Sequence, residues 1–358
     1  MNPKVSVIIP AYNTETYIGK AIESALEQTL TDIEVIIVDD GSSDKTVEVA
    51  KSFTDQRLQV IVNQQNLGAA AARNRAFRAA RGEWIAVLDS DDWYAPERLE
   101  KLVSLANKIN ADMIADDVYL IKDGETSPWS TLIQESGIFI DKIIKIDIVY
   151  FVETDIHGQP GLHLGLSKPL FKREFLVKHG IEYDEEIRMG QDFWLDMKCL
   201  IKGARFFLEP KPYYFYRSRP GSLVYQSRLP RLNQSCKAAK YFMQQEVVKK
   251  NPALMRALSY NLSVFKKNLA YFQIVEPIKQ GKLLTAFTEI KKNPGFFYDF
   301  MSRFPGIVER RIQYYVMNNK SSFDMYPNKQ RKRKTPSQAI TVLSINNASL
   351  HSNNELEC

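Results

Sequence analysis

The residues best suited to chemistry form an acidic run, Asp89-Ser90-Asp91-Asp92, within a chain of 358 residues. Asp89 and Asp91 present two carboxylates with Asp-x-Asp spacing directly after the apolar stretch 84–88. Mg²⁺ and Mn²⁺ prefer hard oxygen ligands of this kind. A divalent metal held by Asp91 and Asp89 would neutralise a diphosphate group as it leaves. The alternative is a solvated turn that caps the next helix, a role open to Asp92.

A second pair of carboxylates, Asp39 and Asp40, follows the Val- and Ile-rich run 34–38. A carboxylate in this position can accept hydrogen bonds from a nucleobase N–H or a ribose hydroxyl. A turn that leads into a helix, capped by Ser42 or Ser43, is the alternative interpretation. This motif is therefore weak evidence by itself.

The stretch Pro10-Ala11-Tyr12-Asn13 ends the first apolar run of the chain. Tyr12 is able to pack against the flat face of a nucleobase. A buried core tyrosine is an equal alternative on this evidence.

Three arginines follow or precede glycine-containing turns. Arg73 lies in the small-residue stretch 66–74, and Arg217 and Arg219 lie in 216–222. A guanidinium pairs with phosphate oxygens in a fork geometry, so each arginine is a candidate for a phosphate contact. The alternatives are a surface arginine at position 73 and an exposed structural loop around positions 217 and 219.

Asp192 stands in the stretch Gly190-Gln191-Asp192-Phe193-Trp194, between a glycine and two aromatic residues. A carboxylate in a partly dry pocket is a better proton acceptor than a solvated one. Asp192 is therefore a candidate general base. An exposed aspartate at a helix start, with core aromatic residues behind it, is the alternative.

Apolar runs and amphipathic stretches alternate along the first 116 residues and indicate how these side chains are positioned. Strand–helix alternation predicts an α/β fold, with a parallel sheet covered by helices on both faces. The carboxyl ends of such strands share one crevice. The three polar clusters that follow strands, 10–13, 39–42 and 89–92, should therefore converge there. The expected strands are 4–9, 34–38, 58–62, 84–88 and 112–115, and the expected helices are 15–29, 44–53, 68–80 and one that starts at Pro96.

The rest of the chain is less regular. We expect a catalytic domain over 1–225, a helical accessory region over 226–326 with breaks at prolines, and a basic, disordered tail over 327–358. No apolar run reaches the ~18 residues of a membrane-spanning helix, and the start of the chain lacks the organisation of a signal peptide. With three widely spaced cysteines, these features favour a cytoplasmic protein with reduced thiols.

Taken in order, these motifs resemble the family 2 glycosyltransferases, whose catalytic domain has the GT-A fold. The matching stretches span residues 4–222, about 60% of the chain, and their joint order and spacing are specific. Residues 165–175 are also similar to the family segment that precedes the catalytic aspartate. The stretches are VSVIIPAYN, VIIVDDGSSDKT, NLGAAAARN, GEWIAVLDSDDW, MGQDFWL and YRSRPGS.

The resemblance implies a role for each matching residue. Asp192 would be the catalytic base and Asp91 the more direct metal ligand, with Asp89 serving the metal, diphosphate and ribose. Gln191 replaces the glutamate that usually precedes the base, and Arg219 stands near a position where many members have histidine. The implied donor contacts are Pro10, Tyr12, Asp39, Asp40, Arg73, Asp89, Arg217 and Arg219.

The resemblance implies an inverting enzyme that transfers a sugar from a nucleoside-diphosphate sugar, here expected to be a UDP-sugar, with Mn²⁺ or Mg²⁺. The acceptor would be a hydroxyl of a saccharide or lipid-linked saccharide in cell-surface polysaccharide synthesis. An inactive nucleotide-sugar-binding or scaffold relative is the alternative.

Other classes of protein fit the sequence less well. The first strand lacks the G-x-G-x-x-G turn of nicotinamide enzymes. The basic stretch 329–334 lacks interleaved aromatic residues, so we expect no nucleic-acid partner. Around Lys266 and Lys267, we expect the apolar residues to pack over the catalytic domain, and a peripheral membrane contact is the alternative. Nothing in the sequence specifies an oligomeric state.

Overall fold

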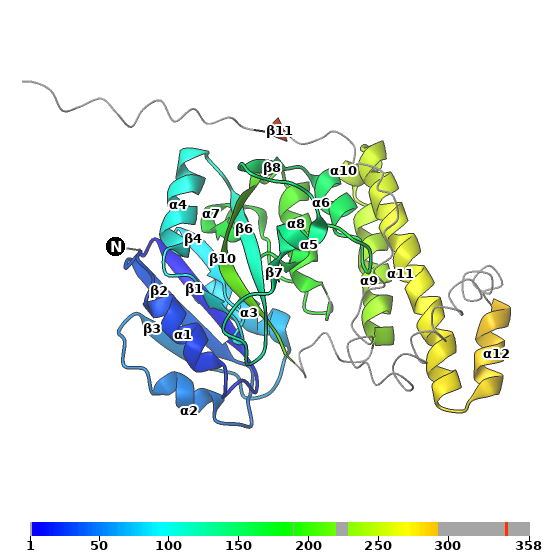
Figure 1. Cartoon of the computed structure of the whole chain (residues 1–358), viewed down its shortest axis with the longest axis horizontal. Coiled ribbons are helices and arrows are strands. Elements are labelled where there is room, and N and C mark those ends of the chain that lie inside the picture. Colours follow the sequence, from blue (N-terminus) through cyan, green and yellow to red (C-terminus); the bar gives the residue numbers. More distant parts are fainter. Residues whose placement is uncertain (1, 189, 220–227, 293–340, 343–358) are drawn as a thin grey trace, which may run out of the picture.

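A computed structural model describes residues 2–188, 190–219, 228–292 and 341–342. One mixed sheet runs through the α/β part, and helices lie against it on both sides (Figure 1). Its strands are β1 (Val5–Ala11), β2 (Ile33–Asp39), β3 (Leu58–Val62), β4 (Trp84–Val87), β5 (Trp93–Tyr94), β6 (Met113–Lys122), β7 (Ser130–Thr131), β8 (Ile144–Ile146), β9 (Leu170–Lys172), β10 (Phe206–Ser218) and β11 (Thr341–Val342).

The strands follow the order β11-β8-β10-β6-β9-β4-β1-β2-β3. Strands β3, β2, β1 and β4 are parallel, as the alternating pattern predicts. Short β9 then inserts antiparallel between β4 and β6, and β10 returns parallel to β6. The prediction of a mostly parallel sheet therefore describes its first half. The second half is mixed because β5, β7 and β8 also pair antiparallel.

The helices connect these strands and continue beyond them. They are α1 (Ile18–Leu26), α2 (Thr46–Lys51), α3 (Ala69–Ala79), α4 (Arg98–Lys108), α5 (Leu132–Ser136), α6 (Ile148–Thr154), the short 3₁₀ helix η1 (Leu164–Leu166), α7 (Arg173–His179), α8 (Gln191–Ile201), α9 (Arg228–Met243), α10 (Glu246–Lys249), α11 (Pro252–Lys279) and α12 (Leu283–Lys292).

Alternation along β1 shows why the sheet is covered on both faces. Val7 and Ile9 belong to the core that includes Ile18 of α1 and Leu99 of α4. Ile8, which points the other way, belongs to the core formed with α3, α8 and the C-terminal helices. Apolar residues on both sides of a strand are typical of a buried parallel sheet.

Several predicted boundaries change in the structure. Helix α4 starts at Arg98, two residues after the expected start at Pro96. Strand β6 runs to Lys122, well past the expected end at 115, because it pairs along its whole length with the long strand β10. This pairing partner lies about 90 residues later in the chain, so the local pattern of residues 112–122 did not reveal it.

The C-terminal helices form a separate layer beside the α/β part. Helix α11 packs along α9 and contacts α6, and α12 folds back onto the far end of α11 (Figure 1). The predicted domain boundary near 225 lies outside the described residues. So does the predicted tail, apart from Thr341 and Val342, which pair with β8. In the part of the chain that the structure describes, no helix combines the length and apolarity needed to cross a bilayer.

Candidate active site

The ends of neighbouring strands bring the predicted polar residues to one edge of the sheet. Asp39 ends β2 and Asp40 follows it, Asp89 and Asp91 follow β4, and these strands flank β1. The far end of β10 approaches the same edge, because Arg217 and Arg219 near its end contact the acidic run. The predicted convergence of the three clusters on this edge is thus reproduced by the topology.

Asp40 binds the protein's own loops through both of its carboxylate oxygens. Oδ1 accepts hydrogen bonds from the side-chain amide of Asn63 (2.7 Å) and from the Leu67 N–H (3.0 Å). Oδ2 accepts from the Gly68 N–H (2.6 Å). Gly68 has φ +99°, a backbone conformation that favours glycine, and it precedes α3. Asp40 therefore fixes the loop that leads into α3.

Asp39 is fastened in a similar way to the loop that follows it. Its carboxylate accepts hydrogen bonds from the backbone of Gly41 and Ser42 and from the Ser42 hydroxyl. Ser42 therefore binds Asp39 and does not cap α2, which begins at Thr46 next to the side chain of Asp44. The prediction that Asp39 and Asp40 contact a base stays a prediction.

Tyr12 is 47% exposed at the end of β1, so the alternative of a buried core tyrosine is wrong. Its neighbour Pro10 is buried within the strand. The exposed ring follows Ala11, whose carbonyl accepts a hydrogen bond from the Asp40 N–H, and it remains suited to stacking on a nucleobase.

Asp89 lies between two buried cations. Its Oδ1 is 2.6 Å from Nη2 of Arg73, and its Oδ2 is 3.0 Å from Nζ of Lys168. Burial disfavours the ionised carboxylate, but Lys168 and Arg73 outweigh burial and hold the pKa of Asp89 well below its usual range. Asp89 is therefore ionised, and the alternative of a surface arginine at position 73 is wrong, since Arg73 is buried.

Lys168 connects Asp89 to the candidate base. Its Nζ lies 2.5 Å from Oδ2 of Asp192 as well as 3.0 Å from Asp89. Although burial disfavours the ammonium, Asp192 and Asp89 raise the pKa of Lys168 above its ordinary value. The lysine is a fixed cation between the two carboxylates.

Buried Arg98 fixes the backbone of Lys168. Its guanidinium pairs with Asp116 (2.7 Å) and donates a hydrogen bond to the Lys168 carbonyl (2.6 Å). It also stacks over the ring of Tyr94.

Asp192 lies in the first turn of α8, and this helix begins directly after Gly190, which has φ +64°. The hydroxyl of buried Tyr183 donates to Oδ1 of Asp192 (2.9 Å), and Lys168 donates to Oδ2. The side chain is 17% exposed. Asp192 is therefore held by two donors at the edge of the charged cluster, which excludes the alternative of a freely exposed helix-start aspartate.

Gln191 is fully used in the position where the family usually has glutamate. Its Oε1 accepts from Nη1 of Arg73 (2.8 Å), and its Nε2 donates to the Ile187 carbonyl (2.6 Å). A glutamate offers no donor for that carbonyl. The amide thus ties Arg73 to the start of α8 without adding a negative charge.

The second half of the acidic run is bound by β10. Oδ2 of Asp91 lies 2.6 Å from Nε of Arg219. Asp92 is buried and accepts from the Tyr214 hydroxyl (2.7 Å) and the Arg217 N–H (2.8 Å). Asp92 therefore anchors β10 and does not cap α4. Arg217 itself donates to the Asp91 carbonyl, so it is not an exposed loop residue.

The Asp91 carboxylate fits a divalent cation better than Asp89 does. Burial and the nearby charge of Asp89 raise the pKa of Asp91 above its usual value, against the opposing effect of Arg219. A cation would relieve this negative potential. Both oxygens of Asp89 already face protein cations. No cluster of three or more metal-binding side chains occurs in the described residues, so donor phosphate oxygens would have to complete the coordination.

Comparison with known proteins agrees with this geometry. Residues 6–173 match the family described as Glycosyl transferase family 2. The succinoglycan biosynthesis protein ExoO of Rhizobium meliloti is 30% identical over 294 residues, which are 82% of this chain and 82% of that protein. The chain belongs to glycosyltransferase family 2. The resemblance seen in the sequence is thereby confirmed, and with it the enzyme class.

Two further relatives of this family 2 glycosyltransferase cover less of each chain. Succinoglycan biosynthesis protein ExoU of Rhizobium meliloti is 37% identical over 206 residues, 56% of this chain and 58% of that protein. The putative glycosyltransferase EpsH of Bacillus subtilis is 46% identical over 233 residues, 63% of this chain and 65% of that protein.

Solved structures of low identity share the fold. TarS 1-349 of S. aureus in complex with UDP-GlcNAc has a TM-score of 0.55 at 19% identity, and covers 82% of this chain and 92% of that chain. The mannosyltransferase PcManGT from Pyrobaculum calidifontis, in complex with GDP-Man and Mn2+, has a TM-score of 0.53 at 18% identity, and covers 90% of this chain and 84% of that chain. The α/β fold with flanking helices and a C-terminal helical region is thus confirmed.

The sequence did not single out two residues of the site. They are Lys168 and Tyr183, whose hydroxyl donates to Asp192. Lys168 stands before Pro169 and two apolar residues. A lysine that becomes buried in such a stretch needs a charged partner. Its partners are 24 and 79 residues away in the chain. The signal was present, but its meaning depended on the fold.

Proposed function

We propose that this enzyme transfers a sugar from a nucleoside-diphosphate sugar, in particular a UDP-sugar, to a hydroxyl of a saccharide or lipid-linked saccharide, with inversion at the anomeric carbon. The observation that carries the proposal is the Asp89–Lys168–Asp192 bridge, which joins a donor-side carboxylate to a carboxylate able to accept a proton. Relatives named for polysaccharide biosynthesis support the class of acceptor.

Asp192 acts as the general base in this proposal. The acceptor oxygen attacks the anomeric carbon while the bond from that carbon to the diphosphate oxygen breaks. The acceptor proton passes to the Asp192 carboxylate, which Tyr183 and Lys168 hold in place. A single displacement of this kind inverts the anomeric configuration, and a positioned base contributes roughly 10²–10⁴-fold to rate.

Arg73, Arg217 and Arg219 serve the donor side. They bring positive charge to the edge where the diphosphate would lie, and Arg219 is already paired with Asp91. A bound Mn²⁺ or Mg²⁺ would supply charge neutralisation for the leaving group. Asp91 would be the first ligand, and Asp89, the second, would have to exchange a pair with Arg73 or Lys168 for the metal. The nucleobase of the donor would lie beside Tyr12, Pro10, Asp39 and Asp40.

The decisive test is Asp192→Asn in a screen of nucleoside-diphosphate sugars that measures release of nucleoside diphosphate. Transfer should fall by at least about a hundredfold, whereas calorimetry should show donor affinity close to that of the wild type. Asp141→Asn, an exposed aspartate of the same α/β part, is the matched control.

Retained turnover in Asp192→Asn would contradict the assignment of the base. If the wild-type enzyme released no nucleoside diphosphate from any donor, with or without acceptors, the alternative of an inactive binding relative would be favoured instead.

We also propose that the enzyme works on the cytoplasmic side of a membrane. The described cysteines, Cys199 and Cys236, are buried and unpaired, which suits a reducing compartment.

A further inference from the structure

Charge is divided sharply between the two parts of the chain. Residues 1–227 carry 26 Lys and Arg against 34 Asp and Glu, a net charge of −8. Residues 228–292, which form α9 to α12, carry 13 Lys and Arg against 3 Asp and Glu, a net charge of +10. Such an asymmetry points to an anionic partner for the helical part.

Helix α12 is amphipathic and covers α11 with one face only. Ala286 is buried, and Ile290 packs with Ile274 and Tyr271 of α11. Away from this contact, Leu284 is 85% exposed and Phe287 is 57% exposed, one turn apart. Two large apolar side chains in successive turns of one helix form an apolar ridge rather than an isolated exposed residue.

Lysines border this ridge. Lys291 continues the same face, with its ammonium 4.8 Å from the centre of the Phe287 ring. Lys282 precedes the helix and is exposed. Lys292 ends the helix, but its Nζ lies 2.7 Å from Oε1 of Glu289, so its charge is already paired. We call Lys282, Leu284, Phe287 and Lys291 the α12 outer face.

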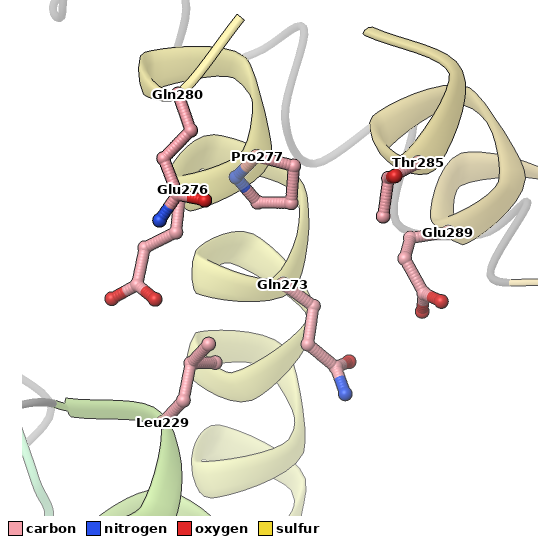
Figure 2. A pocket seen from close by; sticks show the side chains of 7 residues that line it. All are labelled: Leu229, Gln273, Glu276, Pro277, Gln280, Thr285 and Glu289. Carbon is pink, nitrogen blue, oxygen red and sulfur yellow. The ribbon is translucent and has the colours of Figure 1, made fainter. Parts of the chain in front are cut away.

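Two of the acidic side chains of the helical part lie between α11 and α12. A pocket of about 290 Å³ lies between α11 and α12, and Glu276 and Glu289 are among its lining residues. Figure 2 shows that the pocket lining comes from both helices and from Leu229 at the start of α9. Of the 3 acidic residues in 228–292, two thus line this pocket and none belongs to the α12 outer face.

We propose that the α12 outer face docks on an anionic phospholipid bilayer. Leu284 and Phe287 enter the boundary between headgroups and acyl chains, while Lys282 and Lys291 meet lipid phosphates. This inference rests on the proposed function in one respect: a lipid-linked acceptor would explain why such an enzyme needs a membrane. At the same time the acidic catalytic part, net charge −8, is repelled by the surface and stays clear of it.

A bilayer fits this face better than a nucleic acid does. Leu284, its most exposed apolar residue, has no group that can pair with a base or stack on one. The Phe287 ring, which could stack on a base, has the Lys291 ammonium over it. A bilayer uses both the apolar side chains and the lysines, whereas single-stranded nucleic acid needs stacking aromatic faces along a groove.

The test is flotation of the full chain with vesicles of equimolar phosphatidylcholine and phosphatidylglycerol, beside vesicles of phosphatidylcholine alone. The wild type should bind the anionic vesicles at low salt and lose most of that binding at high salt. The double variant Leu284→Ser/Phe287→Ser should reduce the partition coefficient by roughly tenfold or more. Lys282→Glu/Lys291→Glu should reduce it by a similar factor.

Matched controls come from the acidic part of the chain. Phe139 is 86% exposed there, so Phe139→Ser removes an exposed aromatic residue without touching α12. Lys101 and Lys108 are exposed on α4, so Lys101→Glu/Lys108→Glu repeats the charge change. Circular dichroism melting of every variant separates loss of binding from loss of folding, and both controls should bind like the wild type.

Unchanged vesicle binding in folded Leu284→Ser/Phe287→Ser would overturn the proposal. So would wild-type binding to a single-stranded oligonucleotide with none to the anionic vesicles. Nucleoside diphosphate release from a donor in the absence of vesicles is measured in parallel. Release should be unaffected by the α12 variants, so a failure of the docking proposal and a failure of the proposed transferase activity give different results.

Discussion

The two acidic clusters at the edge of the sheet have similar sequences but different partners. Asp39 and Asp40 bind backbone N–H groups and neutral side chains of the following loops. In the run 89–92, Asp89 binds Arg73 and Lys168, and Asp91 binds Arg219. Carboxylates fastened to backbone amides hold the shape of the site, whereas carboxylates paired with cations hold charge in place where a substrate would bind.

Among the variants that test this comparison, Lys168→Met should have the largest effect on sugar transfer. The change leaves Asp89 and Asp192 facing each other without the cation that separates them, and the pKa of Asp89 should rise as a result. We expect transfer to fall by roughly a hundredfold or more, measured as nucleoside diphosphate release. Lys172→Met, a partly exposed lysine at the end of β9, should keep wild-type turnover, and equal losses in both variants would refute a specific role for Lys168.

Asp40→Asn should act on stability. Three donors converge on the two oxygens of Asp40, and an amide can accept at only one of those positions. The free energy of unfolding should fall by about 2–3 kcal/mol, measured by urea denaturation. In contrast, Asp89→Asn should reduce transfer by about a hundredfold. If Asp40→Asn lowered turnover per folded molecule as much as Asp89→Asn, the distinction between the two clusters would fail.

Arg219→Gln should have a smaller effect, on donor binding. The change removes the cation paired with Asp91 at 2.6 Å, which would otherwise share the diphosphate charge. Donor affinity with Mn²⁺ should weaken by roughly tenfold, measured by calorimetry. Arg205→Gln, which breaks a pair with Asp112 away from the site, should leave donor affinity unchanged.

Asp196 offers the mildest test, because it lies one turn after Asp192 but is used differently. Its side chain is fully buried with no hydrogen-bond partner in the described structure. Burial, followed by the charge of Asp192, raises its pKa well above the usual value. Since the folded pKa exceeds the unfolded value of about 3.9, folding requires proton uptake above that pH, and stability declines as pH rises toward the folded pKa.

Asp196→Asn removes this proton uptake. The variant should therefore be more stable than the wild type at pH 8, by about 1–2 kcal/mol, and the difference should shrink as the pH falls toward 4. Turnover should stay within about threefold of the wild type, since no reacting group is changed. A wild type whose stability does not decline relative to the variant between these two pH values would show that Asp196 is ionised and paired.

The sequence predicted the parts of this molecule that depend on local patterns. Strand β3 was placed at 58–62, as observed, and the acidic runs were placed at strand ends. It did not predict β9, or the long pairing of β6 with β10, because these depend on contacts between distant segments. For the same reason the sequence left a helix cap open as a role for Asp92, because its partners Tyr214 and Arg217 lie more than 120 residues later.

The site shows the same division between residue type and partner. Arg73 was predicted to lie near the donor, but its pairing with Asp89 and Gln191 required the fold. The sequence around Asp192 predicts a general base, but it does not reveal the two donors that hold the carboxylate. Lys168 comes from the segment before β9, and Tyr183 comes from the segment before α8.

The contact of Arg98 with the Lys168 carbonyl has a consequence for the timing of catalysis. Arg98 is fully buried and itself fixed by Asp116, so the lysine backbone is held before any donor arrives. Solvent and side chains then need little reorientation while charge develops on the departing diphosphate, and small reorganisation is the main source of electrostatic catalysis. The enzyme completes that reorientation while it folds, and each turnover begins with the charges already in position.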